Sequence, residues 1–378
     1  MKIYGNNIKL GILGGGQLGR MLIQEAISLD VQVHVLDPAA DAPCAGLATT
    51  FTCGSFRDYQ TVLDFGRNMD VLTIEIEDVN VDALSELKSA GVKVFPDPEI
   101  LAVIKDKGLQ KQFFVDHGIP SSAFRLIESS DEIEISELPV VHKLRTGGYD
   151  GKGVSVLRSE KDIETTFKAP SILESLVDIE KELSVIIARN EHGQTVTYPV
   201  VEMVFDDRSN LVDYLFAPAT ISHDLAEQAK DLATKVADAF SFVGILAVEM
   251  FLTKGGDVLV NEVAPRTHNS GHHTIEANFT SQFAQHLRAV VGMPLGSTDT
   301  LRAAAMVNLV GEDGFSGPVV YDGLDKALGM EGVYPHFYGK SETKPFRKMG
   351  HVTILADSID ALPEKVHTVK KIMRVISK

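Results

Sequence analysis

Cysteine and tryptophan are nearly absent from this sequence, whose 378 residues include two cysteines and no tryptophan. Cys44 and Cys53 do not have the spacing of a metal-ligand set. A chain of this length also buries enough apolar surface to be stable without disulfides. These facts exclude a small disulfide-stapled scaffold and favour reduced thiols in a cytoplasm.

Long apolar runs and excess positive charge are absent as well. No stretch reaches the roughly 18 uninterrupted apolar residues that a membrane-spanning helix needs, and the N-terminus does not have the pattern of a signal peptide. Lys and Arg number 36 against 52 Asp and Glu, giving a formal net charge of −16. This charge disfavours non-specific binding to nucleic acid or anionic lipid. We therefore expect a cytoplasmic protein with no nucleic-acid or membrane partner.

The order of predicted strands and helices divides the chain into three units. Residues 1–105 alternate short β-rich runs with helical periodicity, which predicts a doubly wound α/β unit with a parallel sheet. Residues 106–298 are strand-rich and predict an α+β region, and a small β-rich unit follows over 299–378. Helices are predicted at 104–118, where a glycine ends the pattern, and at 361–376 near the end of the chain.

A glycine-rich turn lies between the first predicted strand and helix. Gly14, Gly16 and Gly19 form the pattern G-x-G-x-x-G, and Asp37 ends the next strand about 20 residues later, as in dinucleotide sites. Glycines in such a turn expose backbone amides at a helix N-terminus, which attract an anionic group. A dinucleotide, a phosphorylated small molecule and simple close packing of strand and helix are all compatible with this motif.

A predicted β-hairpin lies near the end of the central unit. Two β-rich runs flank Gly255 and Gly256, and a turn centred between these glycines pairs residues whose numbers sum to 511. This register places apolar residues opposite apolar residues, which makes it self-consistent. The predicted pairs are Leu252 with Leu259 and Phe251 with Val260.

The same register places Glu249 directly opposite Glu262. Two carboxylates that face each other repel unless a positive group lies between them. A divalent cation shared with nucleotide phosphates is an economical solution, since Mg²⁺ prefers oxygen ligands of this kind. Asn261 adjoins Glu262, and the polar segment APRTHNSGHH follows, which is too rich in polar groups for ordinary packing. We therefore predict that Glu249 and Glu262 bind magnesium.

A second glycine-rich loop follows a predicted strand that contains Lys143. Residues 145–153, RTGGYDGKG, hold four glycines within seven residues and precede another strand. Glycines let backbone amides approach phosphates closely, and a lysine supplies a point charge for them. The spacing differs from that of a P-loop, so a hairpin lid over phosphates is the better interpretation.

These motifs together resemble the ATP-grasp superfamily. Within it, the sequence resembles the carboxyaminoimidazole ribonucleotide synthetases in the segments GGGQLGRM, HKLRTGGYDGKG, NEVAPRTHNSGHHT, SQFAQHLRAV and RKMGH, which spread over nearly the whole chain. The resemblance implies an ATP-grasp fold with a lid subdomain at about 120–175. It also implies a homodimer, and an ATP- and magnesium-dependent carboxylation of aminoimidazole ribonucleotide with bicarbonate in purine synthesis.

The resemblance assigns an ATP site between two β-rich subdomains. Lys107 and Lys143 would contact the phosphates, Glu182 the ribose, and Glu249 and Glu262 the magnesium ion. The remaining residues that it implies for ATP are the loop Gly148, Tyr149, Asp150, Gly151, Lys152 and Gly153, the adenine hinge Glu174, Ser175, Leu176 and Val177, and Asn261 beside Glu262. Phe205 stands where some relatives place a histidine near the nucleotide, so that contact is left out.

For the ribonucleotide, the resemblance implies Gln17, Leu18, Glu75, Asn269, Lys340, Arg347 and Lys348. The three cationic residues suit a clamp for a 5′-phosphate, because an acidic protein must concentrate positive charge locally. Lys344 lies close enough in sequence to take part instead of Lys340. The glycine loop at 14–19 would then serve the ribonucleotide.

The chemistry implied is phosphorylation of bicarbonate to carboxyphosphate, followed by transfer of the carboxyl group to the exocyclic amine. Arg266 and His268 are candidates to orient bicarbonate, and Tyr149 and Asp150 to shield the intermediate from water. Direct attack on carboxyphosphate and attack on released carbon dioxide both stay open.

Four alternatives compete with this hypothesis. A formate-dependent glycinamide ribonucleotide transformylase would share the architecture, and a NAD-dependent oxidoreductase would rest on the first glycine loop alone. A regulator would bind ATP without turnover. His268, His272 and His273 also permit a zinc site.

Overall fold

The computed structural model describes residues 8–148, 153–206 and 211–378 of the chain. Its N-terminal part is a five-stranded parallel sheet in the order β3-β2-β1-β4-β5, as the alternating pattern predicted. One face packs on α1, and the other on α2 and α3, so apolar side chains fill both sides. The elements are β1 (Lys9–Leu13), α1 (Gln17–Ser28), β2 (Gln32–Asp37), β3 (Thr50–Cys53), α2 (Tyr59–Gly66), β4 (Val71–Ile74), α3 (Val81–Ser89) and β5 (Lys93–Val94).

The helix predicted over 104–118 is wrong as a single element. The chain forms α4 (Pro98–Lys105) and α5 (Lys107–Asp116), separated by Asp106 in an extended conformation. The Asp106 carboxylate accepts hydrogen bonds from the amides of Gly108 and Leu109, which caps the second helix. Lys107 therefore becomes the first residue of a new helix.

A small antiparallel sheet in the order β6-β9-β7-β8 follows α5. Its apolar core lies between this sheet and the segment around Ile133 and Leu138. The hairpin of β7 and β8 flanks the second glycine-rich loop, as predicted. The elements are β6 (Phe124–Ile127), β7 (Val140–Leu144), β8 (Val154–Leu157), α6 (Glu160–Thr165) and β9 (Ser171–Ser175).

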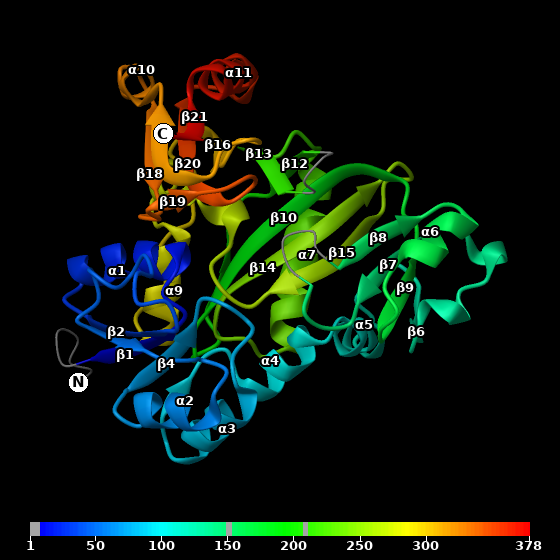
Figure 1. Cartoon of the computed structure of the whole chain (residues 1–378), viewed down its shortest axis with the longest axis horizontal. Helices are drawn as coiled ribbons and strands as arrows, with labels where there is room; N and C mark the ends of the chain where they lie inside the picture. The colour runs from blue at the N-terminus through cyan, green and yellow to red at the C-terminus, as the bar shows by residue number, and fades with distance from the viewer. Residues whose placement is uncertain (1–7, 149–152, 207–210) are drawn as a thin grey trace.

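A nine-stranded sheet forms the body of the molecule, with the path β15-β14-β10-β12-β13-β16-β20-β18 and β11 paired to β10 (Figure 1). Helix α7 covers the back of β10, β14 and β15 and encloses a large apolar core. These elements are β10 (Ile179–Arg189), β11 (Thr195–Thr197), β12 (Val201–Asp206), β13 (Leu211–Ala217), α7 (His223–Ala239), β14 (Gly244–Thr253) and β15 (Val258–Ala264). The short helix α8 (Thr274–Ala277) and helix α9 (Gln282–Val290) come next, and α9 packs beside α1.

The C-terminal strands extend this same sheet, because β16 pairs with β13. The helix predicted over 361–376 is too long: α11 ends at Ile372, and the last residues form β21, which pairs with β17. The elements are β16 (Ala303–Val310), β17 (Gly317–Asp322), α10 (Leu324–Leu328), β18 (Val333–Phe337), β19 (Glu342–Thr343), β20 (Lys348–Ala356), α11 (Leu362–Ile372) and β21 (Arg374–Ser377).

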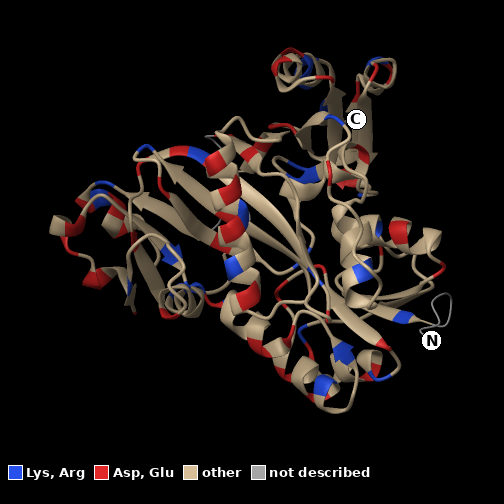
Figure 2. Ribbon diagram, turned by 180° about the vertical axis from the view of Figure 1, so that it is seen from behind, with Lys and Arg blue, Asp and Glu red and all other residues tan. Residues whose placement is uncertain are grey.

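The charged residues of the outer surface mix both signs. Helix α7, which faces the viewer in Figure 2, alternates acidic residues such as Asp224 and Asp231 with Lys230 and Lys235. A nucleic-acid-binding helix would instead carry a basic stripe. Among the helices of the described residues, none is long and apolar enough to cross a membrane.

Candidate active site

A β-bulge builds the carboxylate pair on β14 and β15. Glu249 lies opposite Glu262, as predicted, but the neighbouring pairs are Phe251 with Leu259 and Leu252 with Val258. The register of these pairs is therefore shifted by one residue, and the predicted pairs Leu252 with Leu259 and Phe251 with Val260 are wrong. The register shifts between Glu249 and Met250, because β15 has one extra residue, Asn261, at this point. This β-bulge brings the two glutamates opposite each other.

The bulge also explains why Asn261 and Glu262 serve the same face. Successive strand residues normally point to opposite sides of a sheet. Here Val260 and Val263, which flank the two polar residues, both lie in the core under α7. The consecutive side chains of Asn261 and Glu262 are thus both directed to the open face, where Lys143 and Lys107 meet them.

The pKa values of the two glutamates are shifted in opposite directions. Burial raises the pKa of Glu249, and the nearby Glu262 and Glu182 carboxylates raise it further. The Lys107 ammonium group, by contrast, lowers the pKa of Glu262 and outweighs its burial. A divalent cation would relieve this repulsion, so the two carboxylates and their surroundings fit a magnesium ion.

Lys143 on β7 connects the small sheet to the large one. Its Nζ atom lies 3.1 Å from Glu174 Oε2 and donates to Asn261 Oδ1 at 2.9 Å. Burial alone would raise the pKa of Glu174, but Lys143 and Lys111 outweigh it and hold the carboxyl group ionised. The Glu174 side chain, at the end of β9, therefore faces the lysines.

Lys107 reaches the site because of the helix break before it. Arg145 holds the capping carboxylate of Asp106 through both Nε and Nη2, the latter at 2.7 Å. The backbone amide of Lys107 also donates to the carbonyl of Arg145. Its ammonium group then donates to Glu262 Oε2. Sequence reasoning missed this role of Arg145 and Asp106, although an aspartate before a predicted helix turn is a recognisable cap signal.

Lys111 and Ser122 were also missed. Lys111 follows Lys107 by one helical turn, and its Nζ donates to Ser122 Oγ at 2.8 Å. Ser122 in turn donates to Glu174 Oε2, also at 2.8 Å. A lysine one turn after another ordinarily indicates a solvated helix face, so the sequence carries no signal for this buried pair.

The predicted adenine hinge connects β9 to β10. Ser175 and Leu176 are exposed there, and Val177 is half-buried. Glu182 follows on β10, with its neighbours Lys181 and Leu183 on the opposite face of the strand. Burial raises the pKa of Glu182 to about 7, against a smaller opposing effect of Lys143.

The predicted phosphate loop is only partly described. Gly148 and Gly153 lie at the base of the hairpin, where the amide of Leu144 donates to the carbonyl of Gly153. Gly153 has φ +79°, a conformation that favours glycine. The predicted residues Tyr149, Asp150, Gly151 and Lys152 lie outside the described residues.

The segment after β15 returns to the carboxylate pair. His268 Nε2 lies 3.4 Å from Glu249 Oε1, and its Nδ1 lies 2.9 Å from Ser270 Oγ. Arg266 forms an ion pair with Glu77 at 2.9 Å, which joins this loop to the end of β4. Gln282 holds the loop by accepting from the amide of His268 and donating to its carbonyl oxygen. Neither Gln282 nor Glu77 lies in a motif that would have predicted this role.

The first glycine loop holds the protein's own carboxylates. Asp37 accepts from the amide of Gly15 at 2.7 Å, and Glu75 accepts from the amides of Gly16 and Gly19. Desolvation raises the pKa of Glu75, although these amide hydrogen bonds oppose it. Internal acids therefore already occupy the amides of Gly15, Gly16 and Gly19, which the pyrophosphate of a dinucleotide would need. Gln17 and Leu18 begin α1 directly beside it.

The predicted phosphate clamp lies between β18 and β20. Lys340 Nζ donates to the carbonyl of Lys348 at 2.7 Å, and Arg347 Nη1 donates to that of Glu342 at 2.6 Å. Lys344 is exposed. Asn269 is held elsewhere, by a reciprocal amide pair with Asn308 of β16 at 2.9 and 3.0 Å. The main chain therefore orients two of the clamp residues.

The histidines considered for zinc lie in aromatic contacts. His272 lies against His351 with 4.8 Å between ring centroids, and His351 stacks on His336 at 4.5 Å. Burial lowers the pKa of His272 and of His273. In the described parts of the chain, no group of three or more His, Cys, Asp or Glu side chains could hold a metal ion.

Comparison with known proteins agrees with this architecture. The model of the ribonucleotide synthetase preATP-grasp domain matches residues 7–105, that of the ATP-grasp domain 112–283, and that of the phosphoribosylaminoimidazole carboxylase C-terminal domain 304–365. The N5-carboxyaminoimidazole ribonucleotide synthase of Bacillus subtilis is 37% identical over 93% of this chain and 92% of its own length. This chain belongs to the N5-carboxyaminoimidazole ribonucleotide synthase family.

Solved structures of this synthase family are also similar to this chain. That of the Thermotoga maritima synthetase has a TM-score of 0.92 and 44% identity, over 98% of this chain and 100% of that one. The Aspergillus clavatus enzyme in complex with ADP and 5-aminoimidazole ribonucleotide has a TM-score of 0.86 and 31% identity, over 96% and 98% of the two chains. The ATP-grasp fold predicted from the sequence is confirmed.

Proposed function

We propose that this chain is an ATP-dependent ligase that carboxylates 5-aminoimidazole ribonucleotide with bicarbonate, releasing ADP and phosphate, in purine biosynthesis. The observation that carries the proposal is the opposed pair Glu249 and Glu262 with Lys107 and Lys143 beside it. Two carboxylates on the large sheet, met by two ammonium groups from α5 and β7, suit a nucleotide polyphosphate and its metal ion. The family to which the chain belongs supports the same reaction.

The nucleotide would lie between the small sheet and the large one. Lys107 and Lys143 would contact phosphates, with Gly148 to Gly153 closing over them, including the undescribed Tyr149, Asp150, Gly151 and Lys152. The segment from Glu174 to Val177 would contact adenine, and Glu182 the ribose. Binding of phosphate would release Lys107 from Glu262, which frees that carboxylate for the metal.

Glu249 and Glu262 would hold Mg²⁺, with Asn261 beside them on the nucleotide. The ion supplies charge neutralisation of the transferring phosphoryl group when it is bound. His268 lies next to Glu249 and would help to keep this carboxylate oriented towards the site. Its Ser270 partner fixes the ring.

Bicarbonate would bind beside Arg266 and His268. Its oxygen attacks the terminal phosphorus of ATP, the bond to the ADP oxygen breaks, and carboxyphosphate forms. The amine of the ribonucleotide then takes up the carboxyl group as phosphate leaves, directly or through carbon dioxide. The lysines balance the charge that develops during phosphoryl transfer, and Tyr149 and Asp150 would shield the intermediate.

The ribonucleotide would bind between the first glycine loop and the C-terminal strands. Lys340, Arg347 and Lys348 would clamp its 5′-phosphate, and Gln17, Leu18, Glu75 and Asn269 would complete the site. Glu75 uses both oxygens on backbone amides, so its part is to shape the loop that meets the substrate. The ion pair of Arg266 with Glu77 joins the proposed bicarbonate site to the segment after β4, which also carries Glu75.

We also propose a division into units 1–105, 106–298 and 299–378, a homodimer and a cytoplasmic location. The two cysteines are free thiols in the described structure, which is compatible with a reducing compartment. Size-exclusion chromatography with light scattering measures the oligomeric state. A monomer at micromolar concentration would contradict the dimer.

The test of the reaction is ADP release with both aminoimidazole ribonucleotide and bicarbonate, with each alone, and with formate and glycinamide ribonucleotide. We expect fast release only in the first mixture, together with the carbamate product. Turnover with formate in place of bicarbonate would instead support the transformylase. ATP binding with no turnover in any mixture would support a regulator.

A further inference from the structure

Lys111 is a buried cation that the proposed reaction leaves without a part. It lies on α5 four residues after Lys107, so both project from one helix face. Its side chain is 3% exposed, and its Nζ lies 2.8 Å from Ser122 Oγ and 3.5 Å from Glu174 Oε1. A lysine so fully removed from water is rare unless a charge partner holds it.

The charges around Lys111 do not cancel. Glu174, also 3% exposed, lies between Lys111 on one side and Lys143 on the other, so two ammonium groups share one carboxylate. Lys143 makes its other described hydrogen bond to the neutral Asn261. The trio therefore carries one net positive charge, and that charge lies at the end that faces the nucleotide site.

We propose that Lys111 is a positioning residue for ATP, which neutralises Glu174 so that the charge of Lys143 stays available for a phosphate. Without Lys111, Lys143 and Glu174 would form a neutral buried pair and attract an anion far less. The inference rests on the proposed ATP site. It assigns to that site a positive charge, that of Lys111, which does not itself contact ATP.

Because Lys111 must be protonated to neutralise Glu174, the affinity for ATP should depend on pH. The charged groups that face it are Glu174 on β9, Lys143 on β7 and, farther off, Glu262 on β15. Burial lowers the pKa of Lys111 to about 8, and Glu174 opposes this shift. Loss of the proton above that pH would leave Glu174 to Lys143 alone, so ATP affinity should fall as the pH rises through it.

The decisive variant is Lys111→Gln, which keeps a hydrogen-bond donor for Ser122 and removes the charge. Calorimetric titration of the full chain with magnesium ATP should give a dissociation constant raised about tenfold or more. Because Lys111 does not touch the ribonucleotide site, the KM for ribonucleotide should stay within about twofold of wild type.

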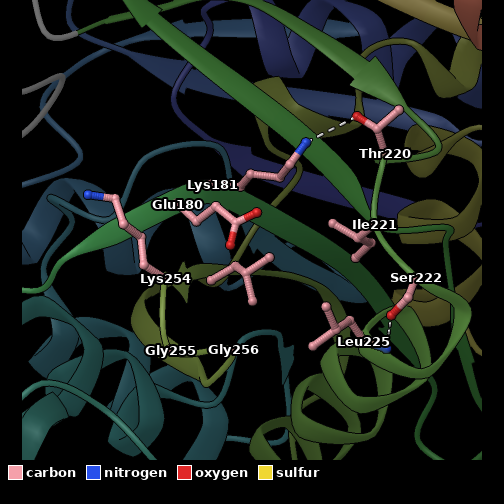
Figure 3. A pocket seen from close by; sticks show the side chains of 10 residues that line it. Glu180, Lys181, Thr220, Ile221, Ser222, Leu225, Lys254, Gly255 and Gly256 are labelled. Atoms are coloured by element: carbon pink, nitrogen blue, oxygen red, sulfur yellow. Dashed lines mark hydrogen bonds between the residues drawn. The ribbon is translucent and has the colours of Figure 1, made fainter.

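A control is Lys181→Gln on β10 of the large sheet. Lys181 pairs with Glu202 at 2.8 Å on the opposite face, beside a cavity of about 620 Å³ near the start of α7 (Figure 3). This variant also loses one ion pair, whose side chains are partly buried, but ATP affinity should stay at the wild-type value. Equal losses of affinity in both variants would make Lys111 a structural residue and overturn the proposal.

The pH profile separates a charge effect from packing. Between about pH 7 and about pH 9, wild-type affinity for ATP should fall, whereas that of Lys111→Gln should show no such fall. Lys111→Arg, which cannot lose its charge in this range, should bind ATP with no such fall as well. An unchanged alkaline fall in Lys111→Gln would contradict the inference.

A double-mutant cycle covers the case in which Lys111→Gln folds poorly. In the Glu174→Gln background no carboxylate competes for Lys143, so adding Lys111→Gln should change ATP affinity by less than about threefold. A full loss in that background overturns the inference. Wild-type protein that binds no ATP would overturn the proposed function and this inference together, whereas equal affinity of wild type and Lys111→Gln overturns only the latter.

Discussion

The two candidate binding regions are built in opposite ways. In the nucleotide site, charged side chains hold one another: Lys107 binds Glu262, and Lys143 and Lys111 bind Glu174. In the phosphate clamp, Lys340 and Arg347 donate to main-chain carbonyl groups. When two side chains bind each other, replacing one also removes the partner's interaction, so the effects of the two substitutions do not add. When each side chain binds a main-chain group, the effects of the two substitutions are independent. Substitutions should therefore be strongly coupled in the first region and nearly additive in the second.

The largest expected effect is that of Lys143→Ala. Lys143 joins Glu174 and Asn261 and would neutralise the transferring phosphoryl group, so its loss should lower kcat roughly 10²- to 10³-fold. ADP release measures the rate, and circular dichroism checks that the fold persists. The control is Lys235→Ala on α7, whose ammonium group donates to the carbonyl oxygen of Gly118. Near-normal turnover in Lys143→Ala would remove the assignment.

Glu262→Gln should have the next largest effect. The variant keeps the shape of the side chain and removes one of two opposed carboxylates, so kcat should fall about tenfold to a hundredfold and the magnesium requirement should change. A magnesium titration at saturating ATP measures this. Combining it with Lys107→Met should cost much less than the sum, because the two side chains are partners. An unchanged magnesium titration would contradict the metal role.

Arg347→Ala tests the other side of the comparison. Removal of one clamp cation should raise the KM for ribonucleotide about tenfold and leave ATP affinity unchanged. Paired with Lys340→Ala, the free-energy losses should add, since each residue has its own carbonyl partner. Calorimetry with each substrate separates the two sites. Strong coupling within the clamp, or weakened ATP binding, would remove the contrast.

The smallest expected effect is on the pH dependence of stability. Burial raises the pKa of Glu182 from 4.5 to about 7, so the folded state binds more protons than the unfolded state between these values. Stability from this group is complete below the lower value and is lost as the pH rises through the upper one. Glu182→Gln should remove roughly 1–2 kcal/mol of that decline, measured by urea unfolding without nucleotide. Identical slopes in both proteins would refute this.

How much could be predicted from the sequence differs between these features. The pairing of Glu249 with Glu262 was predicted correctly, but from a plain hairpin whose other pairs are wrong. At the bulge that reconciles them, Asn261 and Glu262 accept from Lys143 and Lys107, which come from distant segments, so no local rule reveals this arrangement. The break at Asp106 was hidden because helical periodicity continues across it, although the aspartate itself is a cap residue.

The parallel sheet was predictable because strand and helix alternate within short stretches of sequence. Lys111 was not predictable, since its burial is decided by Glu174, more than 60 residues later along the chain. The glycine loop was predicted to present its amides to an anionic group, and in the structure these amides donate to the carboxyl groups of Asp37 and Glu75 of the same chain. A motif thus predicts the chemistry of a turn and not the identity of its occupant.

The pairing of β13 with β16 fixes the distance between the nucleotide site and the phosphate clamp. This pairing makes one continuous sheet from β15 to β18 (Figure 1). The strands of the nucleotide site and the strands that carry the phosphate clamp therefore belong to the same hydrogen-bonded sheet. Moving the ATP site and the ribonucleotide site closer together by deforming this sheet would break main-chain hydrogen bonds between its strands. The four-stranded sheet shares no strand with the nine-stranded sheet, so a change in its position would bring the reactants together without breaking these strand pairings.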